Sequence, residues 1–162
     1  MVSTITNYYN AGFIIFDHLL KHILLVKGFL GWGLPKGYYE ECDKTYFETA
    51  IREIKEELGI DIEDSNVFDI SSSYSLLSYN KETKIYDWGI KPKGFIKRNI
   101  IFYAAKINSN TKFKLQKDEI IQVEWIPLNN ISYIINTNNY SKYEKKKLIN
   151  SINSIKKNII TI

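Results

Sequence analysis

Three glutamates stand close together in the sequence, at a spacing that could hold a metal ion. Glu53, Glu56 and Glu57 occupy positions i, i+3 and i+4, which share one face of an α-helix. Carboxylates crowded on one face repel one another at neutral pH, and a divalent cation removes that conflict. Carboxylate oxygens suit Mg²⁺ or Mn²⁺, and Mg²⁺ held in this way usually binds substrate phosphates as well. The alternative is a solvated acidic face without a ligand.

An amphipathic helix predicted over residues 45–58 would carry these glutamates. Thr45 and Glu48 form a capping-box pattern at its start, and Gly59 is a typical stop. Apolar residues recur at helical spacing away from the glutamates and would face the core: Phe47, Ala50, Ile51, Ile54 and Leu58. A glycine-rich stretch over residues 28–39 leads into the helix and is predicted to be a loop with short extended pieces.

The rest of the chain is predicted to contain strands and one further helix. Short apolar runs predict strands over 13–16, 22–26, 67–77, 98–105 and 120–126. Residues 140–157 predict a second amphipathic helix, whose polar face carries six lysines. This order favours a mixed sheet packed between helices, of the α/β (α+β) class. With 162 residues and no repeat or long linker, the chain is expected to form one domain over residues 1–162.

The composition excludes several classes of protein. Apolar residues make up 44% of the chain, as expected for a domain with a real core. The formal net charge of +4 permits an anionic ligand without requiring one. Because Cys42 is the single cysteine, neither an internal disulfide nor a cysteine-based zinc site can form, and we expect a reducing, cytoplasmic compartment. The most apolar stretch, residues 12–26, includes Asp17 and Lys21, so no membrane span is predicted.

The segment from Gly37 to Ile60 resembles the Nudix box, the signature of the Nudix hydrolase superfamily. That pattern is Gly, five residues, Glu, seven residues, Arg-Glu, an aliphatic residue, any residue, Glu-Glu, any residue, Gly and an aliphatic residue. Its second half matches at every specified position the run Arg52-Glu53-Ile54-Lys55-Glu56-Glu57-Leu58-Gly59-Ile60. The family's lead-in strand and loop resemble the run Gly31-Trp32-Gly33-Leu34-Pro35-Lys36-Gly37. The resemblance covers about residues 11–130.

The first half of the box departs from the pattern by one inserted residue. Asp43, not Glu, stands six residues after Gly37, and eight residues separate it from Arg52. Thr45 keeps its place seven residues before Arg52, so the insertion falls in the loop and the three glutamates keep their helical phase. Three acidic loop residues could replace the missing glutamate: Glu40, Glu41 and Asp43.

The resemblance implies an αβα sandwich that hydrolyses a nucleoside diphosphate linked to another moiety, with Mg²⁺ or Mn²⁺ as cofactor. It assigns the metal ions to the carbonyl of Gly37 and to three carboxylates: Glu53, Glu56 and Glu57. Several members carry a remote glutamate before a strand ending in Trp, and Glu119 holds that position here. Glu119 is therefore a candidate general base or further metal ligand, and Glu57 is the rival base. Arg52 is expected to orient the glutamates.

Fewer residues bear on the substrate. Lys36 is expected to contact a phosphate or only solvent. A basic loop could lie over phosphates or RNA, or be merely solvated: Lys91, Lys93, Lys97 and Arg98. Three tyrosines are candidates to stack a base, although the chain holds 12: Tyr74, Tyr79 and Tyr86. The expected partner is a nucleotide or a nucleotide-capped RNA, with no membrane and no obligatory protein partner.

Two branches of the family fit best. Diadenosine tetraphosphate hydrolases resemble this chain in the Pro-Lys-Gly segment and the remote glutamate. RNA 5′-end pyrophosphohydrolases and mRNA-decapping enzymes resemble it over residues 23–37. Eukaryotic decapping enzymes usually carry a helical domain before the Nudix domain, whereas only about ten residues precede the first predicted strand here, which favours the dinucleoside polyphosphate branch slightly. Non-catalytic Nudix-fold binding proteins form a third class, but they typically lack the carboxylates that this box keeps.

Overall fold

A mixed β-sheet forms the centre of the molecule in a computed structural model, which describes residues 4–160. The strands of this sheet are β1 (Ile5–Asp17), β2 (His22–Gly28), β3 (Gly31–Gly33), β4 (Lys36–Tyr38), β5 (Val67–Asn80), β8 (Gly94–Ile107) and β9 (Gln122–Pro127). Their order is β3-β2-β1-β8-β5, with β4 paired to β1 and β9 paired to β2. Strands β1 and β8 run parallel, and the other pairs in this sheet run antiparallel.

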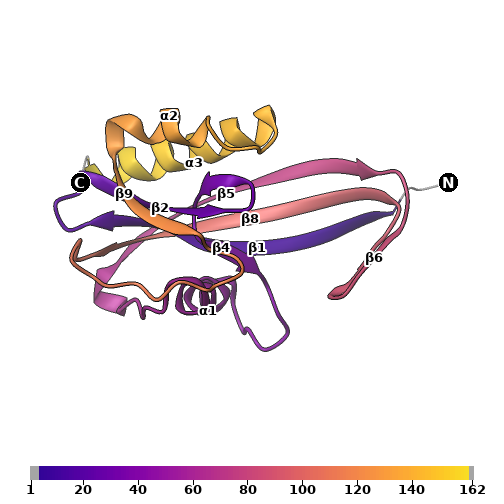
Figure 1. Cartoon of the computed structure of the whole chain (residues 1–162), viewed down its shortest axis with the longest axis horizontal. Helices are drawn as coiled ribbons and strands as arrows, with labels where there is room; N and C mark the ends of the chain where they lie inside the picture. Colours follow the sequence, from indigo (N-terminus) through magenta and orange to yellow (C-terminus); the bar gives the residue numbers. More distant parts are fainter. Residues whose placement is uncertain (1–3, 161–162) are drawn as a thin grey trace.

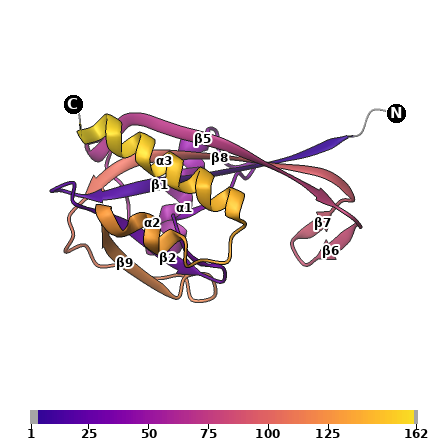
Figure 2. The same cartoon turned by 90° about the horizontal axis from the view of Figure 1, so that it is seen from above.

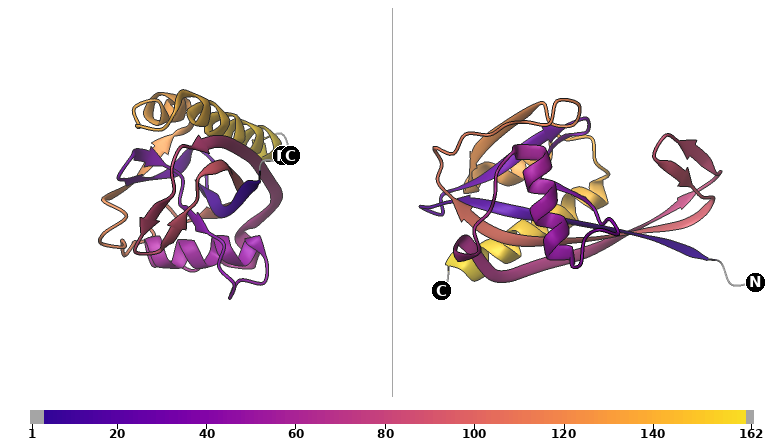
Figure 3. Two further views of the ribbon diagram at one scale, coloured as in Figure 1. Left: turned by 90° about the vertical axis from the view of Figure 1, so that its right-hand side faces the viewer. Right: turned by 90° about the horizontal axis from the view of Figure 1, so that it is seen from below.

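Helices cover both faces of this sheet (Figure 1). Helix α1 (Tyr46–Leu58) packs on one face, and α2 (Ile131–Ile135) and α3 (Lys142–Ile160) lie on the other, as the left view of Figure 3 shows. Two short 3₁₀ turns, η1 (Asp64–Asn66) and η2 (Leu128–Asn130), precede β5 and α2. The predicted mixed sheet between helices is thus confirmed. No helix within residues 4–160 has the length and apolar character needed to cross a membrane.

Alternate side chains of the central strands fill two apolar cores. Ile14, Ile100 and Phe102 point toward α3 and pack in a core with its buried residues Leu148, Ile152 and Ile155. Phe13, Ile15 and Leu24 point toward α1 and pack in a core with Ala50, Ile54 and Leu58. Because the central strands are buried on both faces, they read as unbroken apolar runs.

The ends of α1 follow the predicted capping chemistry with one difference. The Thr45 hydroxyl accepts a hydrogen bond from the Glu48 backbone N–H at 3.1 Å, as a capping residue should. The Glu48 carboxylate, however, accepts from the Lys44 N–H at 2.8 Å, one residue before the position that a capping box specifies. At the other end, Gly59 adopts the left-handed conformation with φ +69° and donates its N–H to the Lys55 carbonyl.

Most predicted elements have the right type but are longer than predicted. Strand β1 begins at Ile5 rather than Phe13, because its first half pairs with β8 in a register that joins Ile5 to Phe95. Strand β8 likewise extends beyond the predicted range 98–105 at both ends. The second long helix, α3, occupies 142–160 instead of 140–157. The short helix α2 was not predicted.

A β-ribbon extends away from the layered body. Strands β5 and β8 continue past the helices and are joined by a two-stranded hairpin of β6 (Lys84–Tyr86) and β7 (Gly89–Lys91), as Figures 1 and 2 show. We call residues 77–97 the arm. The side-chain amide of Asn80 donates hydrogen bonds to the carbonyls of Lys91 at 3.3 Å and Pro92 at 2.8 Å, which tie the hairpin to the end of β5.

Candidate active site

Asp43 and Arg52 join the loop after β4 to helix α1. Both Asp43 carboxylate oxygens accept hydrogen bonds from the Arg52 guanidinium, at 3.0 Å from Nε and 2.9 Å from Nη2. The Thr49 hydroxyl and the Glu40 N–H also donate to Oδ2 of Asp43, at 2.9 and 3.0 Å. These hydrogen bonds, with that from Arg52 the largest cause, hold the pKa of the buried Asp43 carboxyl far below its usual range.

The structure therefore distinguishes the acidic loop residues that the sequence left open. Asp43 is buried and makes the two-point contact with the guanidinium. The exposed Glu40 carboxylate lies 3.6 Å from Nη1 of Arg52, beyond hydrogen-bond range, and Glu41 is exposed. Of these three acidic loop residues, Asp43 therefore makes the two-point contact with Arg52, and its replacement of the missing loop glutamate stays a prediction.

Arg52 also contacts two of the three box glutamates. Its Nη1 donates to Glu53 at 2.9 Å and to both oxygens of Glu56 at 3.2 and 3.3 Å, while Nη2 donates to the Tyr38 carbonyl at 2.8 Å. The guanidinium thus connects the loop, β4 and α1 at one point. The orienting role of Arg52 stays a prediction, and these hydrogen bonds are the contacts through which it would act.

Gly37 lies against the Glu53 carboxylate. A Cβ built on Gly37 would stand 2.0 Å from Cδ of Glu53 and 2.2 and 2.3 Å from its two oxygens. A side chain at this position would displace the Glu53 carboxylate, so glycine lets β4 and the carboxylate lie this close together. A second glycine lets β1 lie close to the segment that leads into β4. A Cβ on Gly12 of β1 would stand 2.1 Å from the Pro35 carbonyl oxygen.

Glu57 is buried beside Glu53 and in an environment that disfavours its charge. Burial is the largest cause of a raised pKa, to about 8, and repulsion from Glu53 and Glu119 adds to it. The ammonium and the backbone N–H of Lys36 act in the opposite direction. Among the atoms of residues 4–160, Oε2 of Glu57 is buried without a hydrogen-bond partner. Burial also raises the pKa of Glu53, against the charge of Arg52.

These groups fit a hard divalent cation. Two buried carboxylates and the backbone of Gly37 form an all-oxygen donor set, with one Glu57 oxygen left unsatisfied. Mg²⁺ is commonly held by only one or two carboxylates together with water and substrate phosphates. Within the described range 4–160, no three acidic, histidine or cysteine side chains already enclose a metal position. The donor set would thus need to be completed by water or phosphate oxygens.

Glu56 and Glu119 lie at the edge of this cluster. The Glu56 side chain is about half exposed and turns toward Arg52. Glu119 is exposed in the turn before β9, where its N–H donates to the Gln116 carbonyl at 3.3 Å. Its charge contributes to the raised pKa values of both Glu53 and Glu57, so the Glu119 carboxylate is near enough to repel both. The roles of these two residues as metal ligands or as a base stay predictions.

An ion pair between the sheet and α3 acts electrostatically on Lys36 of β4. Arg98 of β8 donates to Glu144 of α3 in a half-buried ion pair of 2.6 Å. Burial, and next the charge of Arg98, lower the pKa of the Lys36 ammonium, while Glu144 and Glu57 oppose that change. Sequence reasoning missed Glu144, because 46 residues separate it from Arg98 and no local pattern relates them.

Two of the residues predicted to contact the substrate do not lie beside Glu53 and Glu57. Tyr79 and Lys93 lie on the arm, which Figure 2 shows extending away from α1 and the sheet centre. The Tyr79 ring packs edge-on against Phe95 at 5.1 Å, and the Lys93 N–H donates to Thr83 at 3.2 Å. The predicted basic loop is largely strand, since Lys91 lies in β7 and both Lys97 and Arg98 lie in β8. Of these residues, Arg98 belongs to the ion pair that acts on Lys36. Substrate contact by Tyr79 and Lys93 stays a prediction.

Curated relatives and solved structures resemble most of the chain. The mRNA-decapping enzyme subunit 2 and the m7GpppN-mRNA hydrolase of two Saccharomyces cerevisiae strains are each 29% identical over 144 residues. These alignments cover 87% of this chain, which spans only 12% of each relative's length.

Solved structures show the same fold. A C. elegans Ap4A hydrolase binary complex has a TM-score of 0.59 at 18% identity, covering 91% of this chain and 96% of that one. The E. coli dihydroneopterin triphosphate pyrophosphohydrolase has a TM-score of 0.59 at 13% identity, covering 90% and 95%. The NUDIX domain of Shewanella oneidensis NrtR, in complex with ADP ribose, has a TM-score of 0.56 at 18% identity, covering 94% and 89%.

A family model gives the assignment. The model of the NUDIX domain matches residues 7–146, a range that contains the box, the strand before it and the remote glutamate. Together with the sandwich of helices around a mixed sheet, this match shows that the chain belongs to the NUDIX domain family.

Proposed function

We propose that the chain is a divalent-metal-dependent hydrolase that cleaves a phosphoric anhydride bond in a substrate built on a nucleoside diphosphate. The observation that carries this proposal is the buried pair Glu53 and Glu57 beside the side-chain-free Gly37, with one Glu57 oxygen unsatisfied within residues 4–160. Burial disfavours the charge of both carboxylates and raises the pKa of each, and a bound cation would offset that cost. A polyphosphate substrate needs the same cation to reduce its own charge.

In this proposal the metal ion and the side chains have different tasks. When bound by Gly37, Glu53, Glu57 and Glu56 or Glu119, Mg²⁺ or Mn²⁺ would neutralise phosphate charge and acidify a bound water. Arg52 holds Glu53 and Glu56 in place through its hydrogen bonds. The Lys36 ammonium would face a phosphate oxygen.

The reaction itself requires one proton acceptor. A water oxygen forms a bond to phosphorus, the anhydride P–O bond breaks, and the departing phosphate keeps the electron pair. The proton of the water passes to Glu57 or Glu119, the two carboxylates proposed as general base. Because Glu119 is exposed and Glu57 is buried, the two differ in how readily they exchange that proton with solvent.

A capped RNA 5′ end is the favoured substrate. The decapping protein of Saccharomyces cerevisiae, matched in two strains, is similar to this chain in sequence over 87% of its length. The likeness to Ap4A hydrolase is one of fold, and the dihydroneopterin triphosphate enzyme shares its TM-score of 0.59. The short motifs favour a dinucleoside polyphosphate slightly, but similarity across the whole domain has more weight than a three-residue segment.

A dinucleoside polyphosphate such as diadenosine tetraphosphate is the second candidate. The specific observation in its favour is the Pro35-Lys36-Gly37 segment combined with Glu119, both of which resemble that branch. The polyphosphate bridge of such a dinucleotide contains the same anhydride bond, so the same carboxylates would serve it. The two candidate substrates differ in the group beyond the phosphates: capped RNA carries an RNA chain, whereas diadenosine tetraphosphate carries a second adenosine.

The test is a paired assay of the full chain with Mg²⁺, or with Mn²⁺, on capped RNA and on diadenosine tetraphosphate. We expect release of the cap nucleotide to be the faster reaction, and loss of both activities in chelator. Glu57→Gln should abolish turnover, whereas Glu63→Gln, the same change at an exposed residue outside the site, should not. Binding of RNA or nucleotide without any product under either metal would instead identify a non-catalytic binding protein and overturn the proposal.

A further inference from the structure

The arm exposes apolar and basic side chains together. Seven large apolar residues between positions 77 and 97 are exposed: Leu77, Tyr79, Ile85, Tyr86, Trp88, Ile90 and Phe95. The same segment holds five lysines against two acidic residues: Lys81, Lys84, Lys91, Lys93 and Lys97, with Glu82 and Asp87. An excess of three positive charges on the arm compares with +4 for the whole chain. An exposed apolar surface with this charge indicates an anionic partner.

Within residues 4–160, the lysines of the arm form no ion pair with a carboxylate. Lys84 and Lys91 even stand directly opposite each other across the β6–β7 hairpin. Like charges in opposed positions destabilise a strand pair. A phosphate bound between them would remove that repulsion.

The arm also offers aromatic ring faces. Tyr86 and Trp88 stack with ring centroids 5.0 Å apart and an interplanar angle of 8°, and Trp88 remains 68% exposed. Unpaired bases stack on exposed aromatic rings irrespective of sequence, while lysines track the phosphates. Exposed rings and unpaired lysines on one ribbon are the two parts that a single-stranded nucleic acid requires.

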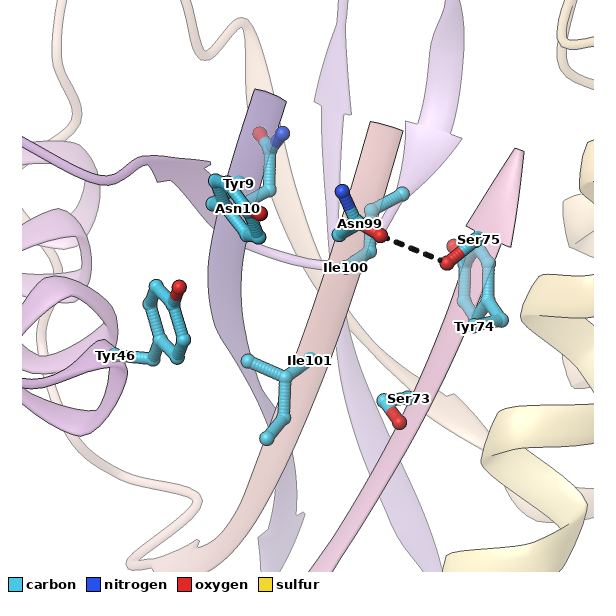
Figure 4. Close-up of a pocket in the computed structure, with 9 residues that line it drawn as sticks. All are labelled: Tyr9, Asn10, Tyr46, Ser73, Tyr74, Ser75, Asn99, Ile100 and Ile101. Carbon is cyan, nitrogen blue, oxygen red and sulfur yellow. Dashed lines mark hydrogen bonds between the residues drawn. The ribbon is translucent and has the colours of Figure 1, made fainter. Parts of the chain in front are cut away.

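One face of the ribbon leads from the arm into a pocket. Cross-strand pairs on this face are Tyr79 with Phe95, Leu77 with Lys97, and Ser75 with Asn99, each two residues further along β5 and β8. Ser75 and Asn99 line a pocket of about 390 Å³ beside the start of α1, and Ser75 donates a hydrogen bond to Asn99 at 3.0 Å (Figure 4). The arm and the pocket therefore share a continuous surface.

The pocket has the features of a nucleobase site. Tyr9 of β1 and Tyr46 of α1 stack at 5.6 Å along one side of it, and each is 41% exposed. In Figure 4 the Ser73 hydroxyl of β5 lies on the opposite side, and the Asn99 amide of β8 lies next to Tyr9, its cross-strand partner. Aromatic walls with a few polar groups are how proteins hold unstacked RNA bases.

We propose that this surface, the pocket together with the arm, binds single-stranded RNA. One base lies against Tyr9 and Tyr46, the phosphates follow Lys97 toward the hairpin, and a further base stacks on Trp88. Tyr46 begins α1, and Glu53 follows seven residues later, about 10 Å along the helix axis. Only the direction of the RNA rests on the proposed function. If the carboxylates act on the 5′ end, the RNA would run outward from them along the arm.

The test measures RNA affinity without catalysis. A 3′-labelled, uncapped 12-nucleotide RNA is titrated with the full chain in chelator and followed by fluorescence anisotropy. We expect the triple variant Lys84→Gln, Lys91→Gln, Lys97→Gln to weaken binding about tenfold or more at low salt. Its salt dependence should be less steep by about 2 in the slope of log K against log salt, for three lost phosphate contacts. Trp88→Ala should weaken binding about fivefold or more.

A matched control removes the same charge elsewhere. Lys142→Gln, Lys146→Gln, Lys156→Gln takes three lysines from α3 and should change the affinity less than twofold. Equal losses in both triple variants would show diffuse electrostatic attraction and overturn the proposal. Unchanged RNA affinity in the arm variants would also overturn it, and reduced self-association of those variants in sedimentation would then identify a second copy as the arm's partner. Circular dichroism establishes that each variant is folded.

The RNA-binding experiment and the hydrolysis assay can fail independently of each other. If the wild type binds RNA through the arm but hydrolyses neither capped RNA nor diadenosine tetraphosphate, the proposed function fails and the arm assignment stands. If capped RNA is hydrolysed and the arm variants bind RNA normally, the reverse holds. In an active enzyme, the arm variants should lose more kcat/KM on capped RNA than on a cap dinucleotide, which has no RNA chain to contact the arm.

Discussion

Asp43 and Arg52 are joined by two parallel hydrogen bonds, although the loop that carries Asp43 is one residue longer than the family pattern. Aspartate is one methylene shorter than the glutamate expected in this loop. Aspartate nevertheless reaches the guanidinium with both carboxylate oxygens. A turn closed by the Asp43 N–H to the Glu40 carbonyl, at 2.9 Å, takes up the extra length before the helix begins.

The Asp43–Arg52 pair should be important for stability. Asp43→Asn removes the charge and replaces one of the two acceptor oxygens by an NH₂ donor, and it should lower the free energy of unfolding by about 1–3 kcal/mol. Glu40→Gln, at the exposed residue 3.6 Å from the same guanidinium, should change it by less than about 0.5 kcal/mol. Urea unfolding at neutral pH measures both. Equal effects would mean that the loop glutamate has been replaced by Glu40 as much as by Asp43.

The contact of Gly37 with Glu53 should be indispensable for metal binding. Gly37→Ala places a methyl group 2.0 Å from the Glu53 carboxyl carbon, so the carboxylate or β4 must move. We expect Mn²⁺ affinity, measured by calorimetry, to fall by about a hundredfold or more. Gly28→Ala is the control, since its Cβ would meet the Glu119 carbonyl at an ordinary 3.4 Å. Normal Mn²⁺ affinity in Gly37→Ala would exclude this glycine from the metal site.

The stability of the metal-free protein should decrease as the pH rises. Burial raises the pKa of Glu57 from its ordinary value of 4.5 to about 8, so the folded state binds more protons than the unfolded state between these values. This contribution is complete below about pH 4.5 and is lost as the pH passes 8, at a slope of at most about 1.4 kcal/mol per pH unit. Urea unfolding in chelator from pH 5 to 9 measures it.

Two comparisons make that pH dependence specific to Glu57. Glu57→Gln should flatten the decrease in unfolding free energy between pH 5 and 8, because the amide does not ionise. Saturating Mg²⁺ should reverse the trend, since the cation favours the ionised carboxylate. A stability curve with the same slope in wild type and Glu57→Gln would contradict the raised pKa of this residue.

The rate should separate the two candidate bases. Glu119→Gln should lower kcat by about 10²–10⁴-fold if Glu119 accepts the proton of the attacking water. Asp118→Asn, at the exposed neighbouring carboxylate, should leave kcat nearly unchanged. If kcat is normal in Glu119→Gln, the proton goes to Glu57 instead. The assay uses whichever nucleotide substrate the paired comparison identifies.

The local parts of the site could be predicted from the sequence. Helix α1, its Thr45 cap, its Gly59 stop and the phase of the box glutamates all depend on residues within one or two turns of each other. The fold class followed from the order of apolar runs and from the family resemblance. The expectation of a single domain over residues 1–162 and that of a cytoplasmic location stay predictions.

The distant relationships could not be predicted. Residues 5–10 contain no apolar run, and they form a strand because β8 supplies partners from 90 positions further along the chain. The ion pair of Arg98 with Glu144 likewise depends on how α3 crosses the sheet. The β6–β7 hairpin is short and exposed, so it leaves little periodic signal. Pairing between remote segments, not local propensity, decides each of these features.

The position of β8 between β1 and β5 has a consequence for how the molecule assembles. Strand β8 is made after both of its neighbours, so β5 cannot join the sheet until the chain has been synthesised past residue 107. Until then β1 presents an open edge, and the first helix has only part of its sheet to cover. Such late insertion of a central strand makes contact order high and folding slow. The nascent chain is therefore most prone to aggregation before β8 emerges.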